Sequence, residues 1–170
     1  MSMLADALII IDLQNGVCFD PSQPQEINNL TSLVNAVNTR IEKYWELGKP
    51  IIFVQHNDEN LLAQSNAWEI LSTIDTSNAD YYVQKTHANA FYKTNLQDIL
   101  IAHDVDEIEI CGAQTEYCID TTIKMAHGLG YDVLMKHNLT TTYDNEFMSA
   151  PTTVKFYEKI WDGRFVEFFD

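Results

Sequence analysis

Short apolar runs that alternate with helical segments constrain the fold of this chain more than any other feature. The run ALIIID at 7–12 is continuous, which is typical of a strand covered on both faces. Further strands are expected at 51–56, 81–85, 107–111, 131–136 and 165–169. Strands that alternate with helices in this way form βαβ units. We therefore predict an α/β fold, a three-layer αβα sandwich around a mainly parallel, Rossmann-like sheet.

Helical spacing fills most of the gaps between these strands. Helices are expected at about 27–47, at about 94–102, after Thr115 and within 150–161. Gly48 follows the first of them, where a helix commonly ends. Residues 57–80 are polar and irregular, with one short helical candidate at 68–74. We expect this segment to form a loop over the sheet edge.

The chain length fits one domain, which we place at 1–170. A chain of 170 residues can bury one core and is too short to expect two. No apolar run approaches the roughly 18–20 residues of a membrane span, and the first residues lack the features of a signal peptide. Three cysteines without a CxxC pattern argue against disulfides and structural zinc. We expect a cytoplasmic protein with reduced thiols and no membrane partner.

The charge balance argues against one large class of partners. The formal net charge is −15 at pH 7, and the chain has only ten Lys and Arg residues. Nucleic-acid binding depends on cationic side chains that neutralise phosphates, and these are too few here. We therefore expect no nucleic-acid partner and interpret the acidity as that of an ordinary surface.

Three chemically active residues fall at the carboxyl ends of expected strands, where ligands bind in parallel sheets. Asp12 follows the first strand, Lys85 ends the third, and Cys118 lies near the start of the helix after the fourth. Each also has an ordinary interpretation, as a turn residue, a surface charge or a core thiol. Unpaired N–H groups and the helix dipole would favour a thiolate at Cys118.

These three side chains could converge on one cleft. A thiolate nucleophile needs a group that takes its proton and a positive charge that keeps it ionised, and aspartate and lysine supply both. Cys111, at the end of its strand, and Cys18 are interpreted as packing residues. The pattern by itself fits thiol chemistry and also fits three unrelated residues.

Three segments, in order, resemble the isochorismatase-like cysteine hydrolase family, which includes nicotinamidases and N-carbamoylsarcosine amidases. They are ALIIIDLQN at 7–15, KTHANAFYKTNL at 85–96 and EIEICGAQTEYCIDTTIKMAHGLGYDVLM at 107–135. The most specific piece is G-x-x-T-E-x-C, followed by an amphipathic helix and GYDV. The resemblance runs from about Ala7 to Thr142 and implies the isochorismatase-like form of the α/β sandwich.

The resemblance implies a catalytic triad of Asp12, Lys85 and Cys118. It also implies a cis peptide bond between Ala113 and Gln114, and an oxyanion hole formed by the backbone N–H groups of Gln114 and Cys118. In such enzymes the thiol attacks an amide or a related non-peptide C–N bond and forms a thioester. We expect a hydrolase with a small-molecule amide substrate, assembled as a homodimer or homotetramer.

The resemblance also bears on metals. Nicotinamidases of this family bind a metal through an aspartate and histidines after the second strand, but here that region offers only His56 and Asp58. Two ligands do not complete a zinc site, so we expect no metal and no other cofactor. His56 is then a pocket residue that orients the substrate, or simply a histidine at a strand end.

Other pocket candidates are aromatic and polar residues beside the triad. The substrate-binding candidates are Gln14, His56, Trp68, Phe91 and Tyr117, with Phe91 in the family's Ala-Phe position after the lysine. Core packing or loop anchoring explains each of them equally well. Glu116 could bind a substrate amine, or it could favour the helix N-terminus.

Other functions stay open. Vinyl ether cleavage, the isochorismatase reaction, is found in members that often lack the cysteine, so Cys118 favours C–N hydrolysis. A non-catalytic protein that binds a small molecule would keep the cleft with an unreactive Cys118. A redox pair of Cys111 and Cys118 is disfavoured, because the two flank a turn and are expected to face different environments.

Overall fold

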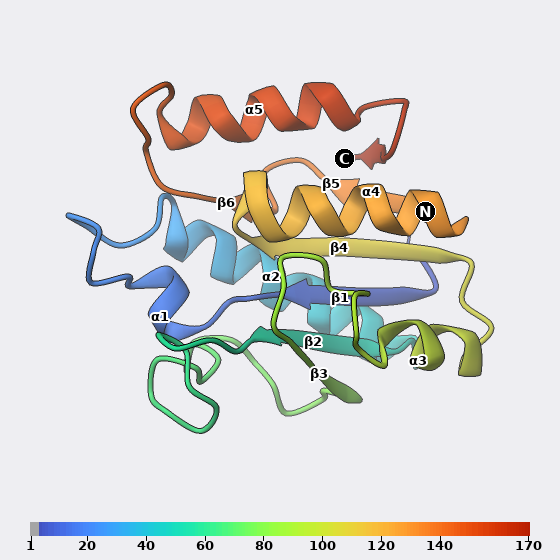
Figure 1. Cartoon of the computed structure of the whole chain (residues 1–170). Helices are drawn as coiled ribbons and strands as arrows, with labels where there is room; N and C mark the ends of the chain where they lie inside the picture. Colours follow the sequence, from blue (N-terminus) through green and yellow to red (C-terminus); the bar gives the residue numbers. More distant parts are fainter. Residues whose placement is uncertain (1–3) are drawn as a thin grey trace.

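The computed structural model describes residues 4–170, which form a seven-stranded parallel sheet between helices (Figure 1). The strands are β1 (Ala7–Ile11), β2 (Ile51–His56), β3 (Tyr81–Lys85), β4 (Glu107–Ala113), β5 (Asp132–Lys136), β6 (Thr140–Thr141) and β7 (Glu167–Phe169). Their order is β3-β2-β1-β4-β5-β7, with β6 beside β4, and the paired strands are parallel. The predicted fold class is confirmed. Residues 1–3, the start of the predicted domain, lie outside the described residues.

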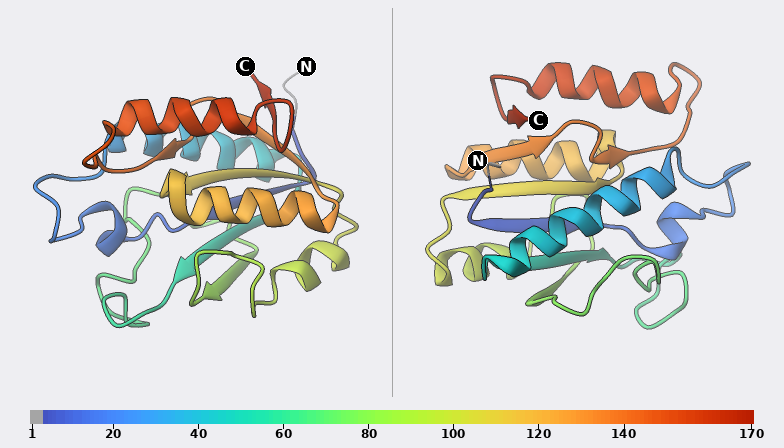
Figure 2. Two further views of the ribbon diagram at one scale, coloured as in Figure 1. Left: turned by 45° about the horizontal axis from the view of Figure 1, so that its top comes forward. Right: turned by 180° about the vertical axis from the view of Figure 1, so that it is seen from behind.

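Helices cover both faces of this sheet (Figure 2). They are α1 (Asn15–Cys18), α2 (Leu30–Glu46), α3 (Leu96–Ala102), the π-helical turn η1 (Thr115–Ile119), α4 (Asp120–Leu129) and α5 (Ala150–Trp161). The back view of Figure 2 shows α2 crossing one face, whereas α4 lies on the other face in Figure 1. Among residues 4–170, no helix is both long and apolar enough to cross a membrane.

The prediction of a short helix at 68–74 is wrong. These residues form turns and one isolated antiparallel bridge, between Gln14 and Ile70. Their backbone groups bond instead to the segment after β1, with the Leu71 N–H donating to the Leu13 carbonyl at 2.9 Å. A helix would need those groups for its own ladder, so the tertiary pairing decides the local structure.

The two faces of the sheet have separate cores because strand side chains alternate. In β1, Leu8 and Ile10 pack with the apolar face of α2, whereas Ile9 packs on the side of α3, α4 and α5. Cys111 belongs to the α2 side, and Cys118 packs against the opposite cluster. The expectation that these two cysteines face different environments is confirmed.

One glycine brings β4 close to β1 at the edge where the strands end. Gly112 has a φ of 125°, and a Cβ atom there would lie 2.1 Å from the carbonyl oxygen of Ile11. Only glycine fits this close approach in this backbone conformation. It places the end of β4 directly beside Asp12, the residue after Ile11.

Candidate active site

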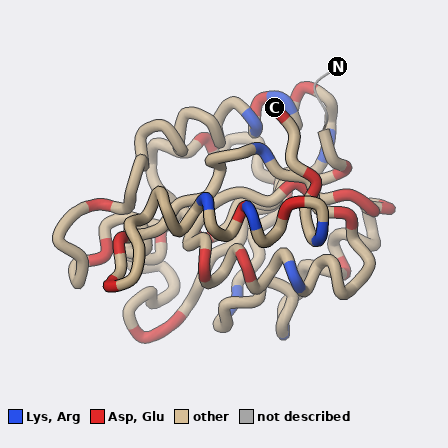
Figure 3. The backbone as a smooth tube through the Cα atoms, turned by 90° about the horizontal axis from the view of Figure 1, so that it is seen from above, with Lys and Arg blue, Asp and Glu red and all other residues tan. Residues whose placement is uncertain are grey.

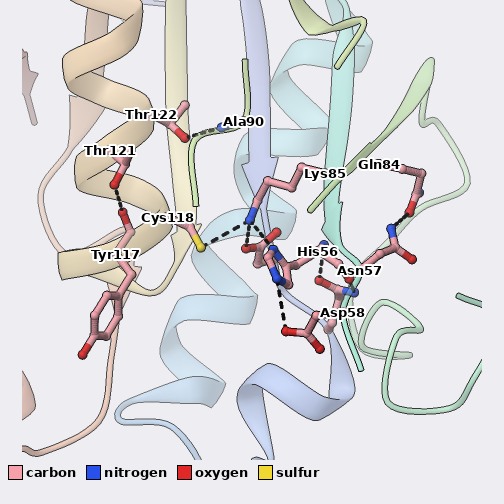
Figure 4. Close-up of polar contacts among 12 residues, drawn as sticks. His56, Asn57, Asp58, Gln84, Lys85, Ala90, Tyr117, Cys118, Thr121 and Thr122 are labelled. Carbon is pink, nitrogen blue, oxygen red and sulfur yellow. Dashed lines mark hydrogen bonds and ion pairs between the residues drawn. The ribbon is translucent and has the colours of Figure 1, made fainter. Parts of the chain in front are cut away.

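The side chains of Asp12, Lys85 and Cys118 meet at the carboxyl edge of the sheet. Lys85 Nζ lies 2.7 Å from Asp12 Oδ2 and 3.3 Å from Cys118 Sγ. Figure 4 shows Lys85 reaching between Cys118 and His56. The structure thus brings together the three side chains that the sequence placed at separate strand ends.

Strand register explains why His56 joins this cluster. His56 and Lys85 are paired neighbours at the ends of β2 and β3, so their side chains leave the same face. Lys85 Nζ and His56 Nδ1 are 3.0 Å apart. Burial lowers the pKa of His56, and the positive charge of Lys85 lowers it further. The neutral ring accepts from Lys85 through Nδ1, which leaves the proton on Nε2, 3.2 Å from Asp58 Oδ2.

Asp12 is buried with half of its hydrogen-bonding capacity unused. Its exposed fraction is 2%, and Lys85 contacts only Oδ2. Oδ1 is buried and has no hydrogen-bond partner among residues 4–170. Asp12 also has a φ of 52°, a left-handed conformation that aspartate tolerates better than most residues. A buried acceptor without a partner is costly, and such atoms gather at functional sites.

Cys118 lies in the π-helical turn η1, directly before α4. Burial raises the pKa of its thiol to about 12, and the negative charge of Asp12 contributes to this rise while Lys85 opposes it. This shift is opposite in direction to the one expected from the helix start. Desolvation and the neighbouring carboxylate favour the thiol over the thiolate.

The turn between β4 and η1 contains a cis peptide bond between Ala113 and Gln114. The carbonyl of Gln114 accepts hydrogen bonds from the N–H groups of Tyr117 and Ile119, at 3.1 and 3.2 Å. These bonds fix the turn that leads to Cys118. Gln114 and Cys118 both line the cavity described next.

A cavity of about 520 Å³ opens above these side chains. Its lining consists of Asp12, Gly16, Val17, Asp20, Pro21, Ser22, His56, Asp58, Asn60, Leu61, Ala67, Gln114, Tyr117 and Cys118. Two of the predicted pocket residues, His56 and Tyr117, are among them. The volume suits a small molecule.

Gln14 does not line this cavity, contrary to expectation. Its side chain is fully buried and acts as a clamp between two backbone segments. The amide nitrogen donates to the carbonyls of His56 and Trp68, and the amide oxygen accepts from the N–H of His56. Both ends of the side chain are therefore committed to holding the loop 57–80 against β2.

Trp68 and Phe91 also lie outside the cavity lining. The indole N–H of Trp68 donates to Gln84 Oε1 at 3.0 Å, which directs the ring toward β3. Phe91 is 8% exposed and stacks on Tyr131 within the core. The carboxylate of Glu116, which accepts from the Thr142 hydroxyl at 2.6 Å, does not line the cavity either. Packing and anchoring explain Trp68 and Phe91, whereas Glu116 Oε2 is buried and has no hydrogen-bond partner among residues 4–170.

The residues that line the cavity opposite Cys118, from α1 and the loop 57–80, were not predicted from the sequence. Gly16 N–H donates to the Ala67 carbonyl at 2.8 Å, and a Cβ atom at Gly16 would lie 2.6 Å from Leu61 Cδ2. The loop 57–80 is thus pressed onto α1, and Asp20 and Asp58 border the space between them. One available signal was Gln-Asn-Gly at 14–16, shortly after the first strand, where a glycine permits close approach.

The residues near His56 do not fit the zinc site of nicotinamidases. His56 Nε2 and Asp58 Oδ2 contact each other at 3.2 Å. Within residues 4–170, no three side chains of His, Cys, Asp or Glu are grouped so that they could hold a metal ion. Two donors leave a zinc ion without a complete shell, so no step below depends on a metal.

A parallel α/β sheet with a thiol, an ammonium group and a buried carboxylate at its carboxyl edge has the side chains that nucleophilic catalysis needs. The family model of the isochorismatase domain matches residues 6–153. The chain therefore belongs to the isochorismatase family, and the resemblance is confirmed.

Individual relatives agree with this assignment. The crystal structure of an isochorismatase family protein is 44% identical, with a TM-score of 0.91, and covers 96% of this chain and 97% of that chain. YrdC, an isochorismatase family protein of Bacillus subtilis, is 26% identical over 141 residues, which are 81% of this chain and 74% of the relative. Nicotinamidase 3 of Arabidopsis thaliana is 28% identical over 161 residues, 85% of this chain and 77% of the relative.

Proposed function

We propose that this protein is a cysteine hydrolase that cleaves an amide, or a related non-peptide C–N bond, of a small molecule. One observation carries the proposal: the Cys118 thiol and the Asp12 carboxylate, which has an oxygen without a hydrogen-bond partner among residues 4–170, line the same cavity, and Lys85 contacts both. Membership of a family with a relative named as a nicotinamidase supports it. In this proposal Asp12, Lys85 and Cys118 form the catalytic triad.

The first half of the reaction forms a thioester. Asp12 takes the proton of the Cys118 thiol, and the sulfur attacks the carbonyl carbon of the amide. The ammonium group of Lys85, close to both, stabilises the negative charge as it moves between them. The N–H groups of Gln114 and Cys118 bind the oxygen of the tetrahedral intermediate. Asp12 then passes its proton to the nitrogen, the C–N bond breaks, and the amine leaves.

The second half uses the same groups with water. Asp12, again a carboxylate, takes a proton from a water molecule that attacks the thioester. The second tetrahedral intermediate collapses with loss of the Cys118 sulfur, which recovers the proton from Asp12. The net reaction consumes one water and releases a carboxylic acid and an amine. His56 stays neutral throughout and holds Lys85 in place through Nδ1.

An activated acyl donor tests the nucleophile without knowledge of the natural substrate. We expect p-nitrophenyl acetate to give a burst of nitrophenolate and an acetyl group on Cys118, located by peptide mass spectrometry, with hydroxylamine releasing the acetyl group. Cys118→Ala should show neither the burst nor the adduct. Cys111→Ala, which removes the fully buried packing thiol, is the matched control and should keep both.

Two results would contradict this function. One is an undiminished burst in folded Cys118→Ala, and the other is a folded wild-type protein that is not acylated. Release of ammonia or amine from a panel of small amides, lost in Cys118→Ala and retained in Cys111→Ala, would then establish C–N hydrolysis itself.

A further inference from the structure

The proposed active-site cavity has an excess of negative charge. Three carboxylates line it, those of Asp12, Asp20 and Asp58. Among the described residues that line it there is no Lys or Arg, and the nearby Lys85 is committed to Asp12 at 2.7 Å. The lowered pKa of His56 keeps that ring neutral at neutral pH, so it adds no positive charge. Asp20 and Asp58 therefore face the cavity without a compensating cation there.

Both of these carboxylates are held in place by backbone groups. Asp58 Oδ1 accepts the N–H groups of Asn60 and Leu61, at 2.8 and 2.9 Å. Burial acts to raise the pKa of Asp58, but these backbone hydrogen bonds and the contact with His56 together lower the pKa. Asp20 Oδ1 accepts the N–H of Ser22 at 2.8 Å, in a segment anchored by a hydrogen bond from the Asp20 N–H to the Tyr143 hydroxyl. Hydrogen bonds of this kind orient a charged group for a ligand.

A separate observation, an unpartnered buried oxygen of Asp12, indicates where the reacting end of a ligand would bind. Asp12 is 2% exposed, and its unpartnered Oδ1 belongs to a residue of the same cavity wall. A ligand whose reacting end meets Asp12 and Cys118 would have the rest of its atoms beside the other lining residues, which include Asp20 and Asp58. Figure 3 shows acidic segments on the loops at the far left, which in Figure 1 is the carboxyl edge of the sheet.

We propose that the cavity selects a small amide that carries a positive charge, such as a primary ammonium or a guanidinium group, away from the scissile bond. This inference rests on the proposed function, which fixes the amide beside Cys118. Asp20 and Asp58 are the residues that bind the cationic group. Amides that carry a carboxylate are disfavoured, because the negative lining repels them. Isochorismate, a dicarboxylate, is disfavoured for the same reason.

Charged thiol reagents test this electrostatic selection directly. The rates at which trimethylammonioethyl and sulfonatoethyl methanethiosulfonate modify Cys118 are each divided by their rates with mercaptoethanol. We expect the cationic reagent to be favoured about tenfold or more at low ionic strength, and less in high salt. The ratio of the two reagents cancels any change in the ionised fraction of the thiol. It therefore reports the cavity charge alone.

Three variants locate the source of the preference. Asp20→Asn and Asp58→Asn should each reduce the ratio by about threefold to tenfold, since each removes one charge near the sulfur. Glu42→Gln removes one exposed negative charge on α2, outside the cavity lining, and should change the ratio less than twofold. Peptide mass spectrometry confirms that Cys118 carries the label.

The outcomes separate this inference from the proposed function. A ratio near or below one overturns the inference, as do equal ratios in the wild type, Asp20→Asn and Asp58→Asn. A Cys118 that reacts with neither reagent also overturns it, because no ligand would then reach the sulfur. If the ratio behaves as expected but Cys118→Ala still hydrolyses amides, the proposed function fails and the charge selection stands.

Discussion

Two buried ion pairs in this protein have the same chemistry but different surroundings. Arg40 of α2 and Glu109 of β4 are 3% and 0% exposed, and Asp12 and Lys85 are 2% and 1% exposed. Both oxygens of Glu109 are used: Oε1 accepts from Arg40 Nε at 2.7 Å, and Oε2 accepts from Arg40 and from the Tyr44 hydroxyl. Oδ2 of Asp12 contacts Lys85, whereas Oδ1 has no hydrogen-bond partner in the described part of the chain, residues 4–170.

We interpret the difference as one between a structural ion pair, Arg40 and Glu109, and the pair that we propose to be reactive, Asp12 and Lys85. A carboxylate whose acceptors are all filled has lost the capacity to take a proton without breaking bonds that replaced its hydration. Asp12 retains that capacity, and it faces a cavity instead of a closed core. Burial and charge are common to both pairs. An oxygen without a partner among residues 4–170, at the wall of a cavity, distinguishes the pair of Asp12 and Lys85.

We call Asp12 and Lys85 the open pair, because Asp12 faces a cavity, and Arg40 and Glu109 the closed pair. The largest effect is expected when the open pair loses the carboxylate of Asp12, its proposed base. Asp12→Asn keeps the size of the side chain but cannot accept the thiol proton. We expect steady-state amide or p-nitrophenyl ester turnover to fall by about 10²- to 10⁴-fold, the usual contribution of a general base. Circular dichroism should show that the variant is folded. Turnover within tenfold of the wild type would remove Asp12 from the mechanism.

The closed pair should respond in the opposite way, with a loss of stability. Glu109→Gln removes the negative charge that faces Arg40 in a buried position. Breaking such a pair typically lowers the free energy of unfolding by about 3–5 kcal/mol. Turnover per folded molecule should stay near the wild-type value, because Glu109 does not line the cavity.

Urea unfolding measures this change, with Glu42→Gln as the matched control. Glu42 is an exposed carboxylate on the same helix as Arg40, and its replacement should change the free energy of unfolding by less than about 0.5 kcal/mol. A Glu109→Gln variant as stable as Glu42→Gln, or one with a large loss of turnover per folded molecule, would remove the contrast between the two pairs.

The strand pattern predicted the fold because its signals are local. Continuous apolar runs such as ALIIID define buried parallel strands wherever they lie in the chain. The segment 68–74 was mispredicted because its backbone bonds to residues after β1, a partner far away in the sequence. Arg40 and Glu109 could not be paired from the sequence either, since only the packing of α2 on β4 shows that both are buried.

In the candidate active site, too, local signals were predictable from the sequence and long-range contacts were not. Asp12, Lys85 and Cys118 follow from strand ends and from family resemblance, because those signals are also local. The raised pKa of Cys118 does not follow from these signals, since it depends on burial and on the charge of Asp12. The cavity wall from Gly16 and the loop 57–80 depends on contacts that no short motif records.

The pH dependence of Cys118 alkylation tests how strongly the charge of Asp12 acts on the neighbouring thiol. Because the pKa of Cys118 is about 12, its rate of alkylation by iodoacetamide should rise with pH without levelling off below about pH 9. Asp12→Asn removes a negative charge beside the sulfur, so the thiol pKa falls. This variant should be alkylated about tenfold faster at neutral pH while its turnover is lost. A plateau near neutral pH in the wild type would show that the thiolate is already formed at rest.

The smallest expected effect is the pH dependence of stability that comes from His56, whose pKa is shifted by the charges of Lys85 and Asp12. Burial and the charge of Lys85 lower its pKa in the folded protein, whereas the unfolded chain has a pKa of about 6.5. As the pH falls below about 6.5, the unfolded state binds a proton first. The free energy of unfolding of the wild type should therefore decrease there, until the pH passes below the folded pKa. The neutral state of His56 stabilises the fold only above that window.

His56→Gln isolates this contribution, because the variant cannot bind the proton. Urea unfolding of both proteins at about pH 7.5 and about pH 5 should show that the wild type loses more stability on acidification, by less than about 1 kcal/mol. The effect is small because the negative charges of Asp12 and of Asp58, which lies 3.2 Å away, partly offset the effects of burial and of Lys85 on the ring. If both proteins lose the same amount, His56 accepts a proton as readily in the folded state as in the unfolded one. Burial and the charge of Lys85 would then be balanced by the carboxylates of Asp12 and Asp58, and the ring would not report the charge of Lys85.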